Sequence, residues 1–282
     1  MDEQLVVRVR GLRKRYGDVT AVDGIDLDVH RGEVFAVLGP NRAGKTSTLE
    51  ILAGFRTRDA GEVTVLGADP QRAGLAWRYG VGVVLQDAYD SGELTVAETV
   101  RHFARYYPDP AHPDEVVEKV GLRAKARARV RTLSGGQRRR LDVAVGVVGR
   151  PRLLFLDEPT TGFDPQARRR FWTLIRGLVA DGTTIVLTTH HLEEVEALAD
   201  RVAVLARGRI AALGDVATFG GRTSGDATVS WMDGGRRHSE NSPDPAARVA
   251  ELHEAFRGPV PGLTVARPSL EDVYLDLIGA YR

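Results

Sequence analysis

The chain has no cysteine among its 282 residues. A disulfide framework and a thiolate metal site are therefore excluded. It also lacks any apolar run near the roughly 18 residues that a membrane-spanning helix requires, because its longest apolar runs are short segments such as residues 81–85. We expect any action at a membrane to depend on a partner chain.

Net charge is almost absent as well, since 39 basic side chains face 38 acidic ones. No global field would steer this chain toward nucleic acid or anionic lipid. The first four residues, Met-Asp-Glu-Gln, are acidic where a signal peptide would be basic and then apolar. The sequence therefore predicts a cytoplasmic protein with no nucleic-acid partner.

A phosphate-binding loop pattern follows the apolar residues 34–38 and precedes a helical segment. The pattern G-x-x-x-x-G-K-[ST] suits phosphate because loop N–H groups and the helix start near Gly44 face the anion. Lys45 adds a charge, and Thr46 offers its hydroxyl to Mg²⁺. A chance match in an ordinary strand-to-helix turn is the alternative. The candidate nucleotide contacts are Gly39, Pro40, Asn41, Arg42, Ala43, Gly44, Lys45, Thr46 and Ser47.

An antiparallel β start is predicted upstream, since residues 5–10 and 25–29 alternate apolar and polar side chains. Tyr16 falls between these segments, in residues 11–17, which we interpret as a loop. Its ring could stack on adenine or pack against one edge of the sheet. Spacing alone does not favour either interpretation.

Three later strands are predicted to end in polar side chains. Gln86 ends the strand at 79–86, the pair Asp157 and Glu158 ends the strand at 153–158, and His190 ends the strand at 184–190. Ligands of α/β proteins bind at such strand ends. Successive strand residues point to opposite sides, so one carboxylate can hold metal-bound water while the other faces a reacting phosphate. Simple solvation of both carboxylates is the alternative.

Residues from about 87 to 150 have a helical character and form a predicted insertion in the α/β body. Within it, Leu133 precedes the run Ser134, Gly135, Gly136 and Gln137, which opens a helix. A serine and two glycines at a helix N-terminus can accept an anion, or can simply cap the helix. Further along, Asp164 and the proline after it are typical of an N-cap and a first helical position.

The order of these motifs resembles the ATP-binding subunit of an ABC transporter over residues 5 to about 215. The resemblance implies an α/β P-loop NTPase core, with a mixed sheet, an antiparallel β subdomain and the helical subdomain at about 87–150. It places the ATP-binding cassette at 1–215 and leaves 216–282 as a small α+β appendage. Residues 219–225 are interpreted as a linker. The segment 268–277 is similar to the C-terminal extension of daunorubicin-type drug-resistance exporters.

The resemblance also implies the cofactors, ATP and Mg²⁺, and the roles of individual residues. Thr46, Gln86 and Asp157 would hold Mg²⁺, and Tyr16 would stack on adenine. Glu158 would be the general base, His190 would contact the γ-phosphate, and Gln86 would also take part in catalysis. These residues would make the chain an ATPase whose hydrolysis is coupled to transport across a membrane.

A head-to-tail homodimer is implied next, in which residues 134–137 of one copy close over ATP held by the phosphate loop of the other. Asp164 is a further expected nucleotide-binding residue. The partner would be a membrane-spanning permease at the inner face of the cell membrane, and export of drug-like or hydrophobic compounds is favoured. A soluble ABC-class ATPase acting on ribosomes or DNA ends is the alternative. It is disfavoured because the chain has one cassette and no heptads between Lys45 and Asp157. A regulator without turnover is disfavoured by Glu158 and His190.

Arg42 is the one departure from the family pattern, which carries glycine at this position of the loop. That glycine suits a backbone with positive φ, where an ordinary residue costs about 1 to 2 kcal/mol. Arg42 is therefore either strained or a ligand contact, and we favour a side chain that points into solvent. The loop N–H groups, Lys45 and Mg²⁺ already supply the positive cradle.

Overall fold

The computed structural model describes residues 5–86, 92–219, 227–267 and 269–279. The chain separates into two compact units, Met1–Ala212 and Leu213–Arg282. Apart from Phe219, the predicted linker at 219–225 lies outside the described residues. Residues 87–91 of the predicted helical insertion and residue 268 of the segment 268–277 also lie outside them.

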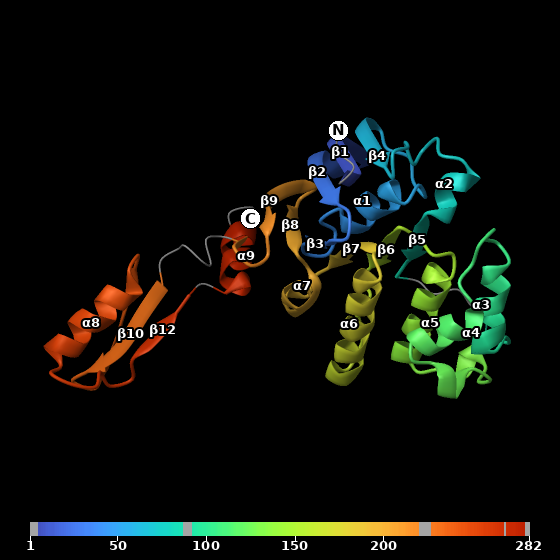
Figure 1. The fold of residues 1–282 in the computed structure, drawn as a ribbon. Helices are drawn as coiled ribbons and strands as arrows, with labels where there is room; N and C mark the ends of the chain where they lie inside the picture. Colours follow the sequence, from blue (N-terminus) through green and yellow to red (C-terminus); the bar gives the residue numbers. More distant parts are fainter. Residues whose placement is uncertain (1–4, 87–91, 220–226, 268, 280–282) are drawn as a thin grey trace. The chain divides into compact units, whose positions relative to one another are not determined.

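The first unit contains two sheets (Figure 1). The smaller one is antiparallel in the order β2-β1-β4, with β1 at Leu5–Tyr16, β2 at Val19–His30 and β4 at Ala60–Val65. The larger one has the order β5-β6-β7-β3-β8-β9, in which the pairs from β5 to β8 are parallel. Its strands are β5 at Val81–Val84, β6 at Leu153–Asp157, β7 at Thr184–Thr189, β3 at Val34–Leu38, β8 at Arg201–Ala206 and β9 at Arg209–Asp215. This arrangement confirms the predicted fold class.

The main core lies between the two sheets, around helix α1 (Lys45–Leu52) (Figure 1). β3, β6 and β7 are buried along their whole lengths, as expected for parallel strands that are covered on both faces. β1 alternates between buried and more exposed positions over its first half. The carboxyl ends of β3, β6 and β7 are therefore fixed by a packed core, and the predicted site residues follow these ends.

Two helices cover the other face of the large sheet, α6 (Pro165–Ala180) and α7 (Leu192–Leu198) (Figure 1). The buried side of α6 is an apolar stripe at helical spacing that consists of Phe171, Leu174, Ile175 and Leu178. The Asp164 carboxylate accepts a hydrogen bond from the Ala167 N–H at 2.8 Å, and a proline follows it. The predicted N-cap of this helix is confirmed.

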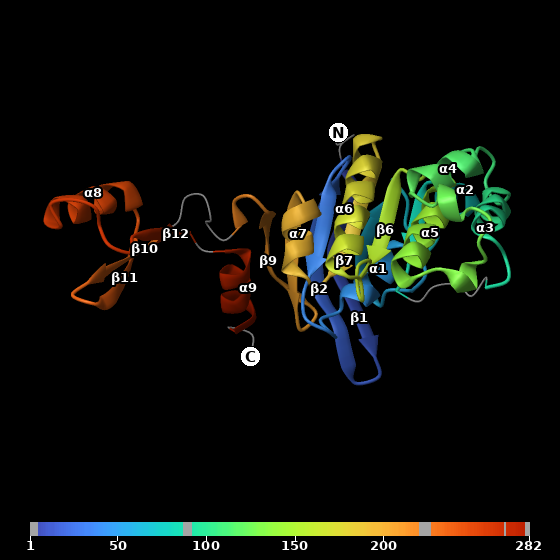
Figure 2. The same ribbon diagram turned by 90° about the horizontal axis from the view of Figure 1, so that it is seen from below.

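The helical region lies to one side of the large sheet (Figure 2). It contains α3 (Val96–Ala104), α4 (Pro113–Lys119), two short 3-10 turns (Arg123–Lys125 and Val130–Thr132) and α5 (Gly135–Val147), while α2 (Leu75–Tyr79) precedes β5. Thr95 and Glu98 form a reciprocal cap at the start of α3, which is why that helix begins where it does. Among the described residues, no helix is both long and apolar enough to cross a bilayer.

Tyr16 is the clearest departure from the predicted local structure. Residues 11–17 were expected to form a loop, but β1 continues to Tyr16, which pairs with Val19 across a tight hairpin. Gly11 has a φ of 59°, and the register shifts next to it. A bulge therefore absorbs the glycine without ending the strand.

The second unit has its own small sheet, in the antiparallel order β11-β10-β12. Its strands are β10 at Ala227–Asp233, β11 at Arg236–Ser242 and β12 at Thr264–Ala266, and its helices are α8 at Pro245–Ala255 and α9 at Leu270–Gly279. Leu252 of α8 packs with Val229 and Val260 in a core of three buried residues. This unit therefore buries far less apolar surface than the first.

Candidate functional site

The predicted phosphate loop connects β3 to α1. Gly44 is the N-cap of α1, with a φ of 102°. A Cβ atom at Gly44 would lie 2.2 Å from the carbonyl oxygen of Ala21, and one at Gly39 would lie 2.4 Å from that of Leu205. Both positions therefore require glycine on steric grounds, and the loop N–H groups and the helix start remain close to one another.

Lys45 is the central cation of this loop, and it is only 5% exposed. Its ammonium donates to the carbonyl oxygens of Gly39 at 2.9 Å and Pro40 at 3.1 Å. The same nitrogen lies 3.2 Å from Oε1 of Glu158. A single buried positive charge therefore connects the loop to the end of β6.

Thr46 and Asp157 come together beneath the loop. The Thr46 hydroxyl donates to Oδ1 of Asp157 at 3.3 Å, and the Thr188 hydroxyl bonds to the same oxygen. Asp157 is only 1% exposed. Gln86 lies just past β5 and lines one cavity with Glu158. A hydroxyl, a carboxylate and an amide are all oxygen ligands, which suits a hard cation such as Mg²⁺.

Glu158 lies at the centre of the cluster. Its Oε2 is 3.1 Å from Nδ1 of His190, close enough for an ion pair but not aligned for a hydrogen bond, and it accepts from the Thr161 hydroxyl at 3.3 Å. Burial by itself would raise the pKa of Glu158, but Lys45, His190 and Thr161 together outweigh it and lower that pKa. The carboxylate is therefore held in its ionised form, between two potential cations.

His190 follows β7 directly, and its ring lies 4.0 Å from the ring of His191, centroid to centroid. His191 is the N-cap residue of α7, and no described hydrogen bond joins its side chain to Glu158. Burial is the main cause that lowers the pKa of His191, and His190 and Arg168 lower it further. The histidine that reaches the cluster is therefore His190.

Tyr16 lies beside the start of α1 although it comes from the small sheet. Its hydroxyl is 3.2 Å from Oγ of Ser47, and the residue is 38% exposed. The Arg56 guanidinium and the Lys14 ammonium lie 5.2 and 5.5 Å from the ring centroid. An exposed aromatic ring is thus present next to the phosphate loop, at the end of a strand.

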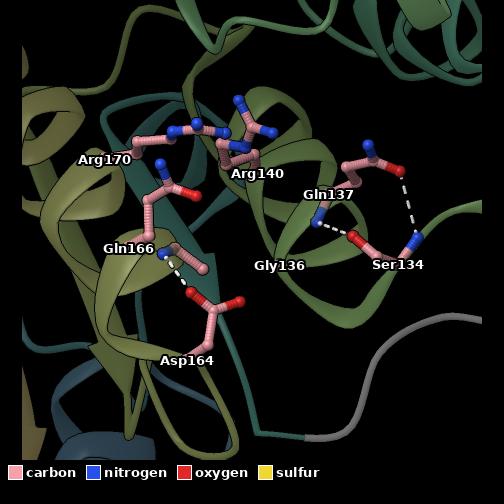
Figure 3. Close-up of a pocket in the computed structure, with 8 residues that line it drawn as sticks. Ser134, Gly136, Gln137, Arg140, Asp164, Gln166 and Arg170 are labelled. Carbon is pink, nitrogen blue, oxygen red and sulfur yellow. Dashed lines mark hydrogen bonds between the residues drawn. The ribbon is translucent and has the colours of Figure 1, made fainter.

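The predicted second anion site forms the start of α5. The Ser134 hydroxyl accepts from the Gln137 N–H at 3.3 Å, and the Gln137 side-chain oxygen accepts from the Ser134 N–H at 3.0 Å. Figure 3 shows this reciprocal cap beside Asp164, the cap of α6. These groups line a cavity of about 110 Å³, together with Arg140, Gln166 and Arg170. Ser134 therefore caps α5 and also lines a cavity.

Arg42 has a φ of 67°, in the left-handed region that we expected for this position. Its side chain is exposed, and it makes no hydrogen bond or ion pair with any residue that the structure describes. The backbone is therefore strained here, and no described residue bonds to the Arg42 side chain in compensation.

Two residues of the site were missed by reasoning from the sequence. Thr188 binds the carboxylate of Asp157, and Thr161 binds that of Glu158. Thr188 could have been found, because parallel pairing of β6 with β7 sets it opposite Asp157. Thr161 lies in the turn after the strand, where spacing gives no such register.

The family model described as "ABC transporter" matches residues 22–161. The daunorubicin resistance ATP-binding protein DrrA3 of Streptomyces coeruleorubidus is 38% identical to this chain, over 97% of this chain and 96% of the relative. The chain belongs to the ABC transporter family. The Nod factor export ATP-binding protein I of Ralstonia nicotianae is 46% identical over 74% of this chain and 67% of that protein.

Solved structures show the same fold. One, entitled "Structure of cbiO1 from clostridium perfringens: Part of the ABC transporter complex cbiONQ", has a TM-score of 0.67 and 28% identity, covering 76% of this chain and 89% of the other. A second, an ATP-binding subunit of an ABC transporter, has a TM-score of 0.71 and 20% identity, covering 96% and 99%. At that identity the second supports the fold alone.

Family and fold together establish that the chain is the ATP-binding subunit of an ABC transporter and an ATPase. The ABC ATPase fold binds nucleotide, and subunits of this kind work with membrane permease components. The predicted family membership and the predicted enzyme class are confirmed.

Proposed function

We propose that this subunit hydrolyses Mg-ATP in a head-to-tail dimer and thereby drives an export permease. One observation carries the proposal: Lys45 at the start of α1 converges with Glu158 after β6 and His190 after β7. Oε1 of Glu158 lies 3.2 Å from Lys45, and Oε2 lies 3.1 Å from His190. A carboxylate held between two nitrogens beside a phosphate loop is suited to phosphoryl chemistry, which depends on positioning and charge.

Nucleotide binding involves two elements in this proposal. The loop from Gly39 to Thr46 cradles the phosphates through its N–H groups, and Ser47 lies at the start of α1 just beyond it. Lys45 turns its ammonium from the loop carbonyls toward phosphate oxygens. Tyr16 stacks on adenine, supported by its exposure and by its hydroxyl next to Ser47.

Mg²⁺ is assigned to three oxygen ligands, namely Thr46 in the first turn of α1, Gln86 after β5 and Asp157 at the end of β6. The contact between the Thr46 hydroxyl and Oδ1 of Asp157 supports the assignment. When bound, the ion neutralises charge on the phosphate oxygens. Thr188 keeps Asp157 oriented, since it bonds to the same carboxylate oxygen.

Glu158 is the proposed general base. Its Oε2 accepts the proton of the attacking water, while Lys45 and His190 hold the carboxylate in place and His190 contacts the γ-phosphate. Gln86 orients the water from the neighbouring strand end, consistent with the cavity that it lines with Glu158. The lowered pKa keeps Glu158 ionised, and therefore able to accept that proton, at neutral pH.

The dimer is proposed because Ser134 and Asp164 are separate from this cluster. No described hydrogen bond or ion pair joins either residue to Lys45, Glu158 or His190. In the dimer, residues 134–137 and Asp164 of one copy contact the ATP that is held by the phosphate loop of the other. ATP then stabilises the closed form, because it binds both copies at once.

The proposal of export rests on the relatives, whereas a position at the inner face of the membrane follows from the proposed pairing with a permease. Their names describe daunorubicin resistance and Nod factor export. We propose by this analogy that the permease exports a drug-like or hydrophobic compound.

We also propose that residues 1–215 form the cassette and 216–282 a separate appendage, because the motifs end before the second unit begins. Deletion of residues 221–282 should leave ATP binding intact. Loss of ATP binding by a truncated chain that still folds, as judged by circular dichroism, would contradict the boundary.

The proposal is tested by Glu158→Gln, which keeps the shape of the side chain and removes the base. Turnover should fall by about 10²-fold or more, while ATP binding persists and a dimer accumulates in Mg-ATP. Phosphate release and gel filtration measure these effects. Near-normal phosphate release from the variant would refute the assigned role.

A further inference from the structure

Arg139 of α5 is a buried cation that the proposed chemistry does not use. It is only 7% exposed. Its guanidinium donates from Nη2 to the carbonyl of Asp157 at 2.6 Å, from Nε to the carbonyl of Pro159 at 3.2 Å, and from Nη1 to the carbonyl of Leu85. All three acceptors are backbone groups at the ends of β5 and β6.

Their positions in the chain are informative. The carbonyls of Asp157 and Pro159 lie on either side of Glu158, and the carbonyl of Leu85 immediately precedes Gln86. Because β5 and β6 are parallel neighbours, their carboxyl ends leave unpaired carbonyls at one edge of the sheet. The planar fork of an arginine can satisfy several of these acceptors at once, which a lysine cannot do as well.

The backbone between the two carbonyls that Arg139 binds has an unusual conformation. Glu158 has a φ of 44°, in a region that side chains other than glycine rarely adopt. Its N–H donates to the carbonyl of Thr188 on β7 at 3.1 Å. Such a conformation persists only when the surroundings over-determine it. Arg139 and Thr188 both bind the peptide group that precedes Glu158, and Arg139 also binds the carbonyl of Pro159, the residue that follows Glu158.

Packing alone would not require a charge at this position. The nearest described carboxylate is that of Asp142, 3.9 Å from Nη1 of Arg139. Burial lowers the pKa of Arg139 and raises that of Asp142. A buried cation without a close ion pair is costly, and an apolar side chain of similar length would fill the space at less expense. The hydrogen bonds to the strand ends are what the guanidinium adds.

We propose that Arg139 is a positioning residue for ATP hydrolysis, because its guanidinium binds the backbone carbonyls of the residues before and after Glu158 and so keeps Glu158 in the conformation that aims its carboxylate. This inference rests on the proposed role of Glu158 as general base. Arg139 acts through the backbone and does not touch the phosphates in this scheme.

Arg139→Met tests the inference, because methionine fills the same space and donates no hydrogen bond. In the full chain with Mg-ATP, kcat should fall at least tenfold while ATP affinity stays within threefold, since no described hydrogen bond or ion pair joins Arg139 to the phosphate loop. Arg139→Lys keeps a cation and some donors, and it should recover part of kcat. Arg176→Met is the matched control: Arg176 also donates to a carbonyl, that of Ala197, far along α6 from the strand ends. It should leave kcat unchanged.

A double-mutant cycle separates positioning from general destabilisation. In the Glu158→Gln background, Arg139→Met should reduce the residual turnover less than threefold, because the group that it positions is already gone. A merely structural role would reduce turnover equally in both backgrounds. If Arg139→Met does not fold, Arg139→Lys is put through the same cycle, with the same criterion.

The two hypotheses fail in different ways. Normal turnover by Glu158→Gln overturns the assignment of the base, whatever Arg139 does. Suppose instead that Glu158→Gln is inactive. The role of Arg139 is then overturned, and that of Glu158 stands, if folded Arg139 variants keep the parent's kcat. The same conclusion holds if these variants lose kcat together with ATP affinity, or lose it equally in both backgrounds.

Discussion

The phosphate-loop cluster and the start of α5 differ in how many hydrogen bonds and ion pairs their functional side chains make within one chain. In the first, Lys45, Asp157 and Glu158 are joined to one another or to neighbouring side chains by ion pairs and hydrogen bonds between residues on or just after three elements, α1, β6 and β7. At the start of α5, the side chains of Ser134 and Gln137 bond only to each other's backbone N–H groups among the residues that the structure describes. The first region is preorganised within one chain.

This difference indicates where a second copy would be needed. A helix start with two glycines and a serine presents N–H groups that can bind an anion. No carboxylate among the described residues bonds to these N–H groups. The phosphate loop, in contrast, already carries its cation. We therefore infer that ATP binding belongs to one copy, whereas closure over ATP depends on two.

The largest effect is expected from Lys45→Ala, which removes the cation on which the first region is built. ATP affinity should fall at least tenfold, about 1.4 kcal/mol, and turnover by about 10²-fold or more, because the phosphates and Glu158 both lose their partner. Nucleotide titration and phosphate release measure this. Lys119→Ala, which breaks an exposed pair with Asp181, is the control and should change neither. Parent-like ATP affinity in Lys45→Ala would contradict the conclusion that the phosphate-loop cluster, unlike the start of α5, already carries the cation for ATP.

Ser134→Asp tests the same contrast from the other side. Aspartate is as good an N-cap as serine, so α5 should remain capped and the melting temperature should not fall. Its carboxylate would, however, face the phosphates of the partner's ATP. We expect the ATP-dependent dimer to disappear and turnover to fall at least tenfold, while ATP affinity of the single copy is kept.

Ser134→Ala provides the matched control for capping. It removes the cap at a cost of about 1 kcal/mol and should lower the melting temperature, but it adds no repulsion. An ATP-induced dimer of Ser134→Ala on gel filtration, together with a monomeric Ser134→Asp, supports the sandwich. A Ser134→Asp protein that dimerises normally in Mg-ATP contradicts it.

A smaller, pH-dependent effect is expected from Glu194, which lies on α7 behind His190. The residue is fully buried, and neither carboxylate oxygen has an aligned hydrogen bond. Burial raises its pKa, although Thr189, Thr160 and Trp172 partly oppose the shift. A raised folded-state pKa stabilises the fold below the ordinary value for glutamate, and that contribution is lost as pH rises through the raised pKa.

Glu194→Gln removes this titration. The melting temperature of the variant relative to the parent should therefore increase between pH 5 and pH 8, by roughly 2 °C or more, the shift that about 1 kcal/mol produces in a chain of this size. The neighbouring exposed Glu193→Gln should show no such trend. A constant or falling difference for Glu194→Gln would refute the idea that the protein carries a penalty for ionising Glu194.

The smallest effect is expected from Arg42→Gly. Glycine relieves the positive φ, so the variant should melt no lower than the parent, and it should bind Mg-ATP within a few-fold. Arg42→Ala removes the guanidinium but keeps the strain, and it should match the parent in both measurements. A loss of affinity beyond tenfold in both variants would show that Arg42 contacts the nucleotide.

Much of the fold and of the candidate site could be predicted from the sequence because the signals are local. Apolar runs predicted β3, β6 and β7 and their polar ends, and the serine and glycine run predicted the start of α5. Asp164 before a proline predicted the start of α6. Each signal depends on a backbone N–H group, a steric limit or burial along one short segment. β11 was not predicted, since its charged residues form a strand only by pairing with β10.

Other features depend on residues that are far apart in the chain. Tyr16 comes to lie beside Ser47 because β1 extends through a bulge into a hairpin, and its partner is 31 residues away. The register of β6 against β7 sets Thr188 opposite Asp157. A periodic pattern carries no information about such register, because it reports only which face of a strand is buried.

The family, the phosphate loop, the glycines that the loop requires, and the strand that ends in Asp157 and Glu158 all follow from the sequence alone. Only the tertiary structure shows that the buried Arg139 guanidinium binds the carbonyls of Asp157 and Pro159, on either side of Glu158, whose φ is 44°. The physical reason is that local backbone preferences disfavour this conformation in glutamate. It can exist only where packed elements from elsewhere in the chain supply hydrogen bonds that outweigh the strain.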